Sequence, residues 1–241
     1  MAIELPGEVV SFLQFIGVNW PQVNEDKVRE LGAHVREFAD NIRSTHDEAT
    51  ATVQRIGQSY QGASYEALLA KWGSLSSSHM DELLNACGVV ATALDAAADV
   101  IVAMKLECIA ELAVLAATFV ADQAAAVATL GLAEAAEVAI VEAAEKLVDF
   151  LTQQLEQYVI GEVIGAAVEP LVGVVSAAVG GLMFQAAENA LGVGAGGGAG
   201  DGFYVHPDEL HAHAEVMHQH AETVAGHAEL FRTKLAGVSF E

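Results

Sequence analysis

The sequence predicts an all-α protein. We expect an antiparallel helical hairpin, extended by long alanine-rich helices and followed by a separate C-terminal helix of the coiled-coil type. Hydrophobic residues make up 53% of the 241 residues but aromatic residues only 6%, so alanine, valine and leucine must supply most of the packing. Only four prolines interrupt the chain, and apolar residues recur every three or four positions over long stretches. Small side chains at this spacing favour closely packed helices.

The charge of the chain excludes one class of partner. A total of 33 acidic and 10 basic side chains gives a formal net charge of −23. A surface this acidic repels phosphate backbones, so we expect no nucleic-acid partner. The first 18 residues contain no lysine or arginine, so we expect no cleaved secretory signal. Cys87 and Cys108 would lie about 30 Å apart on one continuous helix, and we interpret them as small buried hydrophobes.

The first elements are predicted to be a short helix and a long one. The short helix follows Pro6 and ends near Gly17. The long helix begins after Asn24, which is a suitable N-cap because two acidic residues follow it in the first turn. One apolar stripe runs along the long helix and calls for an antiparallel partner. Its members are Val28, Leu31, Val35, Phe38, Ile42, Thr45, Ala49, Val53 and Ile56.

The stretch Ser59–Gly62 interrupts this pattern and predicts a hairpin apex. Helical spacing resumes at Tyr65, and a short turn between two long helices makes them antiparallel neighbours. We expect Gly57 and Gly62 to permit the reversal; an ordinary helix–helix turn without a further role is the alternative. The predicted apolar face of the second helix consists of Tyr65, Leu68, Leu69, Trp72, Leu75, Met80, Leu84 and Cys87.

Two further helices are predicted, from Glu82 to Thr129 and from Ala133 to Val168. The uncharged run 170–187 is close to the minimum length of a membrane span, so it is either a buried or interface helix or a membrane-inserted one. The glycine-rich run 192–202 is predicted to be a linker. Its GxGxxG pattern follows no predicted strand, so we expect no dinucleotide cofactor. The resulting domains are a helical domain at 1–190, a linker at 191–203 and a tail at 204–241.

The tail predicts a helix with a regular docking seam and many histidines beside it. The seam, with spacings of four and three, consists of Leu210, Ala214, Met217, Ala221, Val224, Ala228, Phe231 and Leu235. His211 and His218 lie on one flank, and His213, His220 and His227 on the other. No two histidines there are three or four residues apart, so we expect no metal site on one helix, although one built across helices or subunits is an alternative. A further hypothesis is that these histidines sense pH, because imidazole titrates near pH 6.5.

Several segments together resemble a known family. ELPGEVVSFLQFIGVNWPQVNED, SYEALLAKW and MKLECIAELAVLAATFV are similar to the CpnT-like N-terminal domains of actinobacterial polymorphic toxins. These belong to the WxG-motif helical hairpins that type VII secretion exports. Tyr60, Gln61 and Gly62 fall where the group has Trp-x-Gly. The group's Tyr-x-x-x-acid motif fits Tyr158 with Glu162, and also Tyr204 with Asp208; we favour the first pair because Pro207 interrupts a helix through the second.

The resemblance implies a non-enzymatic export or assembly module of type VII secretion. It implies that the chain leaves the cytoplasm without a cleaved signal, to be secreted or held at the cell surface. The implied partners are further copies of itself, small WxG-family helical proteins and the secretion machinery; the tail from Tyr204 resembles such small proteins. Two alternatives are a channel that inserts residues 158–190 into a membrane, and a toxin-free docking partner of a full-length polymorphic toxin. The sequence contains no HExxH or GxSxG motif, so we expect no enzyme.

Overall fold

The computed structural model describes residues 3–129, 134–168, 171–173, 175–176 and 204–239. About 90% of it is helical, which confirms the predicted all-α class. The chain forms two compact units. Unit 1 contains residues 1–30, 93–167 and 239–241, and unit 2 contains residues 31–92 and 168–238.

Unit 1 begins with helix α1 (Gly7–Ile16), which ends where the sequence predicts. Gly17 has a φ of 75°, a left-handed conformation that glycine adopts without steric cost, and it closes the helix. The buried face of α1 carries Phe12, whose ring centroid lies 5.3 Å from that of Phe119. Aromatic contact therefore fixes α1 against the later part of the same unit.

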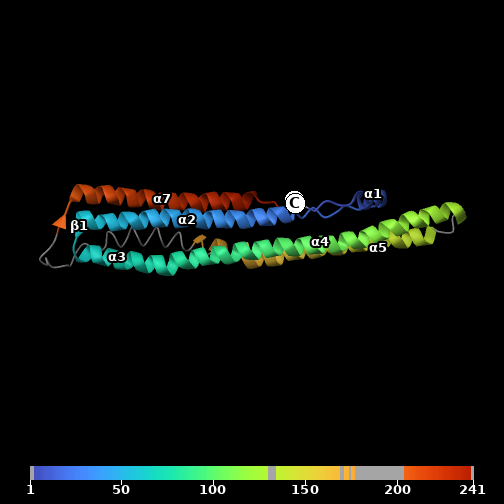
Figure 1. The fold of residues 1–241 in the computed structure, drawn as a ribbon, viewed down its shortest axis with the longest axis horizontal. Helices are drawn as coiled ribbons and strands as arrows, with labels where there is room; N and C mark the ends of the chain where they lie inside the picture. Colours follow the sequence, from blue (N-terminus) through green and yellow to red (C-terminus); the bar gives the residue numbers. More distant parts are fainter. Residues whose placement is uncertain (1–2, 130–133, 169–170, 174, 177–203, 240–241) are drawn as a thin grey trace. The chain divides into compact units, whose positions relative to one another are not determined.

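Two further long helices are α4 (Asp81–Thr129) and α5 (Glu134–Tyr158), and Figure 1 draws both. The predicted helical stretch to Val168 changes type after Tyr158, where the π-helix η2 (Val159–Val168) follows α5. Glycines 161 and 165 lie in this stretch and have low α-helix propensity. Spacings of three and four nevertheless continue through both elements, in the buried residues Ile140, Ala144, Val148, Leu151, Leu155, Val159 and Val163.

The predicted hairpin is formed by α2 (Glu25–Ser59), α3 (Ala63–Leu75) and the π-helix η1 (Ser76–Met80), and it belongs to unit 2 from residue 31 onward. The indole nitrogen of Trp72 donates to the Thr50 hydroxyl at 2.9 Å, and farther from the apex His46 lies 2.9 Å from the Ser76 hydroxyl. The step from Trp72 to Ser76 on the second arm corresponds to the step from Thr50 back to His46 on α2, so the arms are antiparallel. All nine residues of the predicted α2 stripe are buried.

Two details of the predicted hairpin are wrong. Gly57 lies inside α2 and not in the turn, where it leaves room for the ring of Tyr65: a Cβ on Gly57 would be 2.5 Å from the Tyr65 oxygen. The second arm also changes register. Leu69, which precedes η1, is 39% exposed and lies off the packed face. After η1, Leu83 is buried and the predicted Leu84 only half-buried, because the wider turns of η1 rotate the residues that follow it.

The tail helix α7 (Pro207–Gly237) lies beside α2 in unit 2 (Figure 1). A strand that the sequence did not predict leads into it. Strand β2 (Tyr204–Val205) pairs antiparallel with β1 (Tyr60–Gln61) at the hairpin apex, with Tyr60 opposite Val205 and Gln61 opposite Tyr204. The apex and the start of the tail are therefore joined by backbone hydrogen bonds.

Some predictions fall outside the described residues. These include the linker at 191–203 and most of the uncharged run 170–187. Within the part of the chain that the structure describes, no helix is long and apolar enough to cross a membrane. The channel interpretation of residues 158–190 therefore stays a prediction.

Candidate helix-docking and export site

The apex of the hairpin is built from two stretches of backbone that are far apart in the sequence, residues 59–62 and 204–206. After the paired strands, the His206 amide donates to the Ser59 carbonyl at 2.8 Å, which lengthens the ladder by one contact. The buried Ser59 hydroxyl donates to the Glu209 carboxylate at 2.7 Å. Both the backbone and the first turn of α7 are thus attached to the last residue of α2.

The three residues of the predicted export motif lie at this apex. Tyr60 is half-buried and Gln61 exposed, and together they form β1. Gly62 has a φ of 150° and begins α3, whose first amides, from Tyr65 and Glu66, donate to its carbonyl at 3.0 and 3.2 Å. Since an L side chain rarely adopts this φ, the strand-to-helix turn depends on a glycine here.

The two Tyr-x-x-x-acid candidates lie in different units. Tyr158 ends α5 in unit 1, and Glu162 lies in η2, where its side chain is outside the described set. Tyr204 lies in β2 of unit 2, and Asp208 is exposed in the first turn of α7. Pro207 does not disrupt this second motif as the sequence suggested, because it occupies the start of α7, where its missing N–H costs no hydrogen bond.

The predicted seam of α7 contains one fully buried anchor. Phe231 is 3% exposed, and its ring stacks on Phe38 of α2 with centroids 4.6 Å apart. Beside it, Lys234 donates to Glu37 at 2.5 Å, and this hydrogen bond lowers the pKa of the Glu37 carboxyl. Of the other seam residues, Ala214 is exposed, and the half-buried ones are Leu210, Met217, Ala221, Val224, Ala228 and Leu235.

The two histidine flanks have different surroundings. On the inner flank, the Nε2 atoms of His227 and His220 lie 3.1 and 3.4 Å from the hydroxyls of Thr45 and Thr52, and His213 is half-buried. On the outer flank, His211 and His218 are exposed, and His218 lies 3.4 Å from Glu222. The described residues contain no group of three side chains suited to a metal ion. The pH-sensing hypothesis stays a prediction.

The matched family agrees with this hairpin architecture. The WXG100-like domain matches residues 3–147, more than half of the chain. The chain belongs to the WXG100-like family. It is accordingly a helical protein related to type VII secretion, in a family of non-enzymatic secreted helical proteins that typically pair or oligomerise with helical partners. No curated protein and no solved structure matches the chain. The tail helix lies outside the matched residues.

An open groove of about 370 Å³ lies along one side of the WXG100-like hairpin. His46 stacks on Trp72 with ring centroids 5.1 Å apart, and burial lowers the pKa of this histidine. A neutral imidazole packed on an indole is suited to holding the two arms together. The groove is lined by Arg43, His46, Asp47, Gly73, Ser76, Met80, Asp81 and Leu84.

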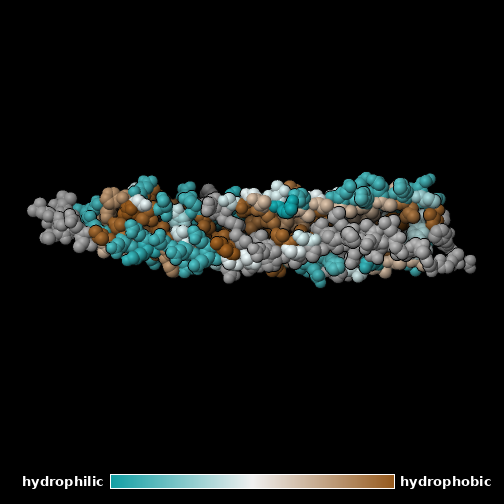
Figure 2. All heavy atoms as spheres, turned by 180° about the vertical axis from the view of Figure 1, so that it is seen from behind, coloured by the Kyte–Doolittle hydropathy of each residue, from teal (hydrophilic) through white to brown (hydrophobic). Residues whose placement is uncertain are grey.

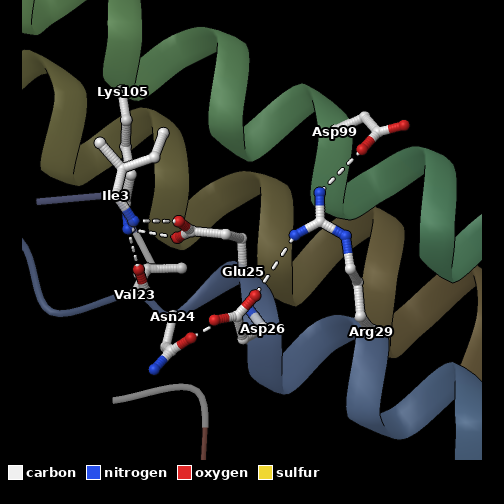
Figure 3. Close-up of polar contacts among 8 residues, drawn as sticks. All are labelled: Ile3, Val23, Asn24, Glu25, Asp26, Arg29, Asp99 and Lys105. Carbon is white, nitrogen blue, oxygen red and sulfur yellow. Dashed lines mark hydrogen bonds and ion pairs between the residues drawn. The ribbon is translucent and has the colours of Figure 1, made fainter. Parts of the chain in front are cut away.

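Sequence reasoning missed a buried ion pair in unit 1 of the WXG100-like protein. Lys105 of α4 donates to Glu25 at 2.6 Å and also to the Val23 carbonyl, while the Ile3 amide donates to the other Glu25 oxygen at 2.6 Å (Figure 3). Glu25 was predicted only as an acid in the first turn of the long helix. The available signal was Lys105 itself, the one lysine or arginine between Lys71 and Lys146.

Proposed function

We propose that this WXG100-like protein is exported by a type VII secretion system and carries a composite export signal at its hairpin apex. One half of the signal is Tyr60–Gly62 and the other is Tyr204 with Asp208. The pairing of β1 with β2 carries this proposal, because it holds the two motifs together at one end of unit 2. A surface assembled in this way exists only in the folded protein, which suits a signal that is not a cleaved peptide.

The second tyrosine–acid pair is preferred over Tyr158 and Glu162 for two reasons. It lies on the strand that pairs with the apex and in the helical turn that follows, which Glu209 attaches to Ser59. Asp208 is also exposed and therefore accessible to a receptor. Tyr158 and Glu162 belong to the other unit.

In this proposal the chain acts as a helical export or assembly module without catalysis. The contacts at the apex are backbone strand pairs and the buried Ser59–Glu209 hydrogen bond, which join the tail to the hairpin, and the matched family is non-enzymatic. Whether the chain accompanies a CpnT-like toxin is a separate question from its export. The module interpretation needs only the hairpin, its apex and the attached tail.

Export from a host with a type VII system tests the proposal. The variants are Tyr60→Ala with Gly62→Ala, Tyr204→Ala with Asp208→Ala, and Tyr158→Ala with Glu162→Ala as the matched control. We expect the wild type and the control in the medium, and the first two variants inside the cell, as in a strain that lacks the secretion motor. Circular dichroism should show that all variants keep their helices. Retention of the control, with export of the Tyr204/Asp208 variant, would reverse the assignment; export without the motor would refute the route.

A further inference from the structure

The contact between α2 and α7 repeats with a period of seven residues. Thr45 meets His227 and Thr52 meets His220, so seven residues forward on α2 correspond to seven residues backward on α7. This is the register of two antiparallel helices in a heptad arrangement. The contact continues at both ends of α7, through the Phe38–Phe231 stack and the Ser59–Glu209 hydrogen bond described above.

The threonine–histidine pairs select one register. Thr45 and Thr52 are buried, and their hydroxyls donate to the carbonyls of Asn41 and Glu48 in their own helix. In the Nε2–H tautomer each histidine donates to its threonine oxygen, and the Thr52 oxygen also accepts from the Arg55 guanidinium at 2.9 Å. A slip of α7 by one turn would place these imidazole donors against the apolar surface of α2 and leave them unsatisfied.

Little apolar surface of α2 remains for any other helix. Its nine-residue stripe is buried, and none of the large exposed apolar side chains in the described ranges belongs to α2. WXG100 proteins typically pair with helical partners, so the coverage of α2 within one chain requires an explanation.

We propose that α7 is a built-in helical partner, which covers in cis the face of α2 that a separate WXG100-type helix would otherwise occupy. Covalent attachment gives α7 a high effective concentration at this face, so a free helix competes poorly with it. The inference concerns helix pairing and does not depend on export, so either can fail without the other.

Cross-linking in the full chain tests whether the pairing is within one molecule. The variant carries Glu37→Cys on α2 and Lys234→Cys on α7, two positions that meet at the surface, and a short bismaleimide reagent joins the two new thiols. Burial raises the pKa of Cys87 and of Cys108 to about 11, so the native thiols react little at neutral pH. We expect a cross-link within a single chain.

The matched control replaces Lys234→Cys with Arg232→Cys, since Arg232 is 75% exposed and pairs with Glu229 of its own helix. We expect little cross-linking in this control. A cross-link between two chains would show a helix exchange with a second copy and overturn the proposal. Equal cross-linking of both pairs, or none in either, would also overturn it.

Competition with a peptide tests whether α7 closes α2 to other helices. The probe is a labelled peptide of residues 204–239, added to the full-length wild type or to the variant His220→Ala with His227→Ala. The variant keeps Thr45 and Thr52 bonded to their own helix carbonyls, so no buried hydroxyl donor is orphaned.

We expect fluorescence anisotropy to show that the peptide binds the variant at least about tenfold more tightly than the wild type. The reason is that the variant's own α7 has lost two side-chain hydrogen bonds to α2 and competes less well with the peptide. Circular dichroism should show that the variant remains helical. If wild type and variant bind the peptide equally, α7 does not close the face and the inference is wrong. If that variant unfolds, Lys234→Glu takes its place. The new carboxylate repels the exposed Glu37 carboxylate of α2, so the peptide should again bind more tightly than to the wild type.

Discussion

At the scale of single residues, the most constrained group is the Glu25 carboxylate in unit 1. Burial by itself raises the pKa of Glu25, but the hydrogen bond from Lys105, the backbone hydrogen bonds and the charge of Lys105 together outweigh it, so this pKa lies below its ordinary value. The exposed salt bridges of Arg29 with Asp26 and Asp99, also drawn in Figure 3, contribute little by comparison. The stability of unit 1 should therefore depend on the Glu25–Lys105 pair.

Replacing Lys105 with methionine should destabilise the protein by about 3–5 kcal/mol at pH 7, because it leaves a buried carboxylate without its cation. Urea unfolding monitored by circular dichroism measures this loss. The double variant Lys105→Met with Glu25→Gln removes both charges and should recover much of the stability. A double variant no more stable than the single one would contradict this explanation.

The Glu25–Lys105 pair also makes the free energy of unfolding depend on pH. The folded-state pKa of Glu25 is below its ordinary value of 4.5, so the pair stabilises the fold at neutral pH. That contribution is lost as the pH falls through the folded-state pKa. In Lys105→Met the isolated carboxyl should instead take up a proton readily. The difference in stability between the two proteins should then narrow towards about pH 4.

At the scale of elements, packing between helices decides whether a glycine is required. A Cβ on Gly57 of α2 would lie 2.5 Å from the oxygen of Tyr65 and 2.6 Å from its Cζ, so the ring would have to move. On α4, Gly88 is exposed and a Cβ there meets no atom within 4 Å. The two glycines are equal in helix propensity and differ only in what surrounds them.

Gly57→Ala should therefore destabilise the hairpin by about 1–3 kcal/mol through overpacking. Gly88→Ala should stabilise the protein by about 0.5–1 kcal/mol, since alanine favours a helix more than glycine does. Thermal unfolding of the two variants gives the comparison. Combining Gly57→Ala with Tyr65→Ala should remove the clash. If both single variants shift stability in the same direction, the contact with Tyr65 is not what requires Gly57.

Most of the elements could be predicted from the sequence because helical spacing is a local property. The whole apolar stripe of α2 and the left-handed end at Gly17 follow from neighbours along the chain. The pairing of Tyr60–Gln61 with Tyr204–Val205 could not be predicted, because each segment is too short to show strand periodicity and they are far apart in sequence. The burial of Leu83 in place of Leu84 was also missed, since no local pattern revealed the π-helix η1 that precedes them.

The candidate site was predictable in composition but not in geometry. The apex motif and the seam of α7 were recognisable from residue types and spacing. Which histidine flank would contact α2 depends on the buried hydroxyls of Thr45 and Thr52, and these form part of an otherwise apolar face. A tertiary contact therefore distinguished two flanks that are equivalent in sequence.

At the scale of the whole molecule, a large negative charge coexists with exposed apolar side chains. The formal charge is −23, and the sequence pI is about 4.5. Figure 2 shows apolar patches between hydrophilic ones on the visible face. The side chains of Phe15, Val114 and Val120 in unit 1 are each more than 60% exposed. Apolar contact favours the association of copies, whereas their like charges oppose it.

Association of copies should therefore increase with salt. The Debye length falls from about 8 Å at 0.15 M to about 3 Å at 1 M, which screens the repulsion but not the apolar contact. Light scattering coupled to size-exclusion chromatography should show larger species at high salt. Val114→Glu with Val120→Glu should abolish the shift, and Val89→Glu, an exposed position in unit 2, should not. A mass that is independent of salt, or equal effects of these variants, would show that these side chains do not drive self-association.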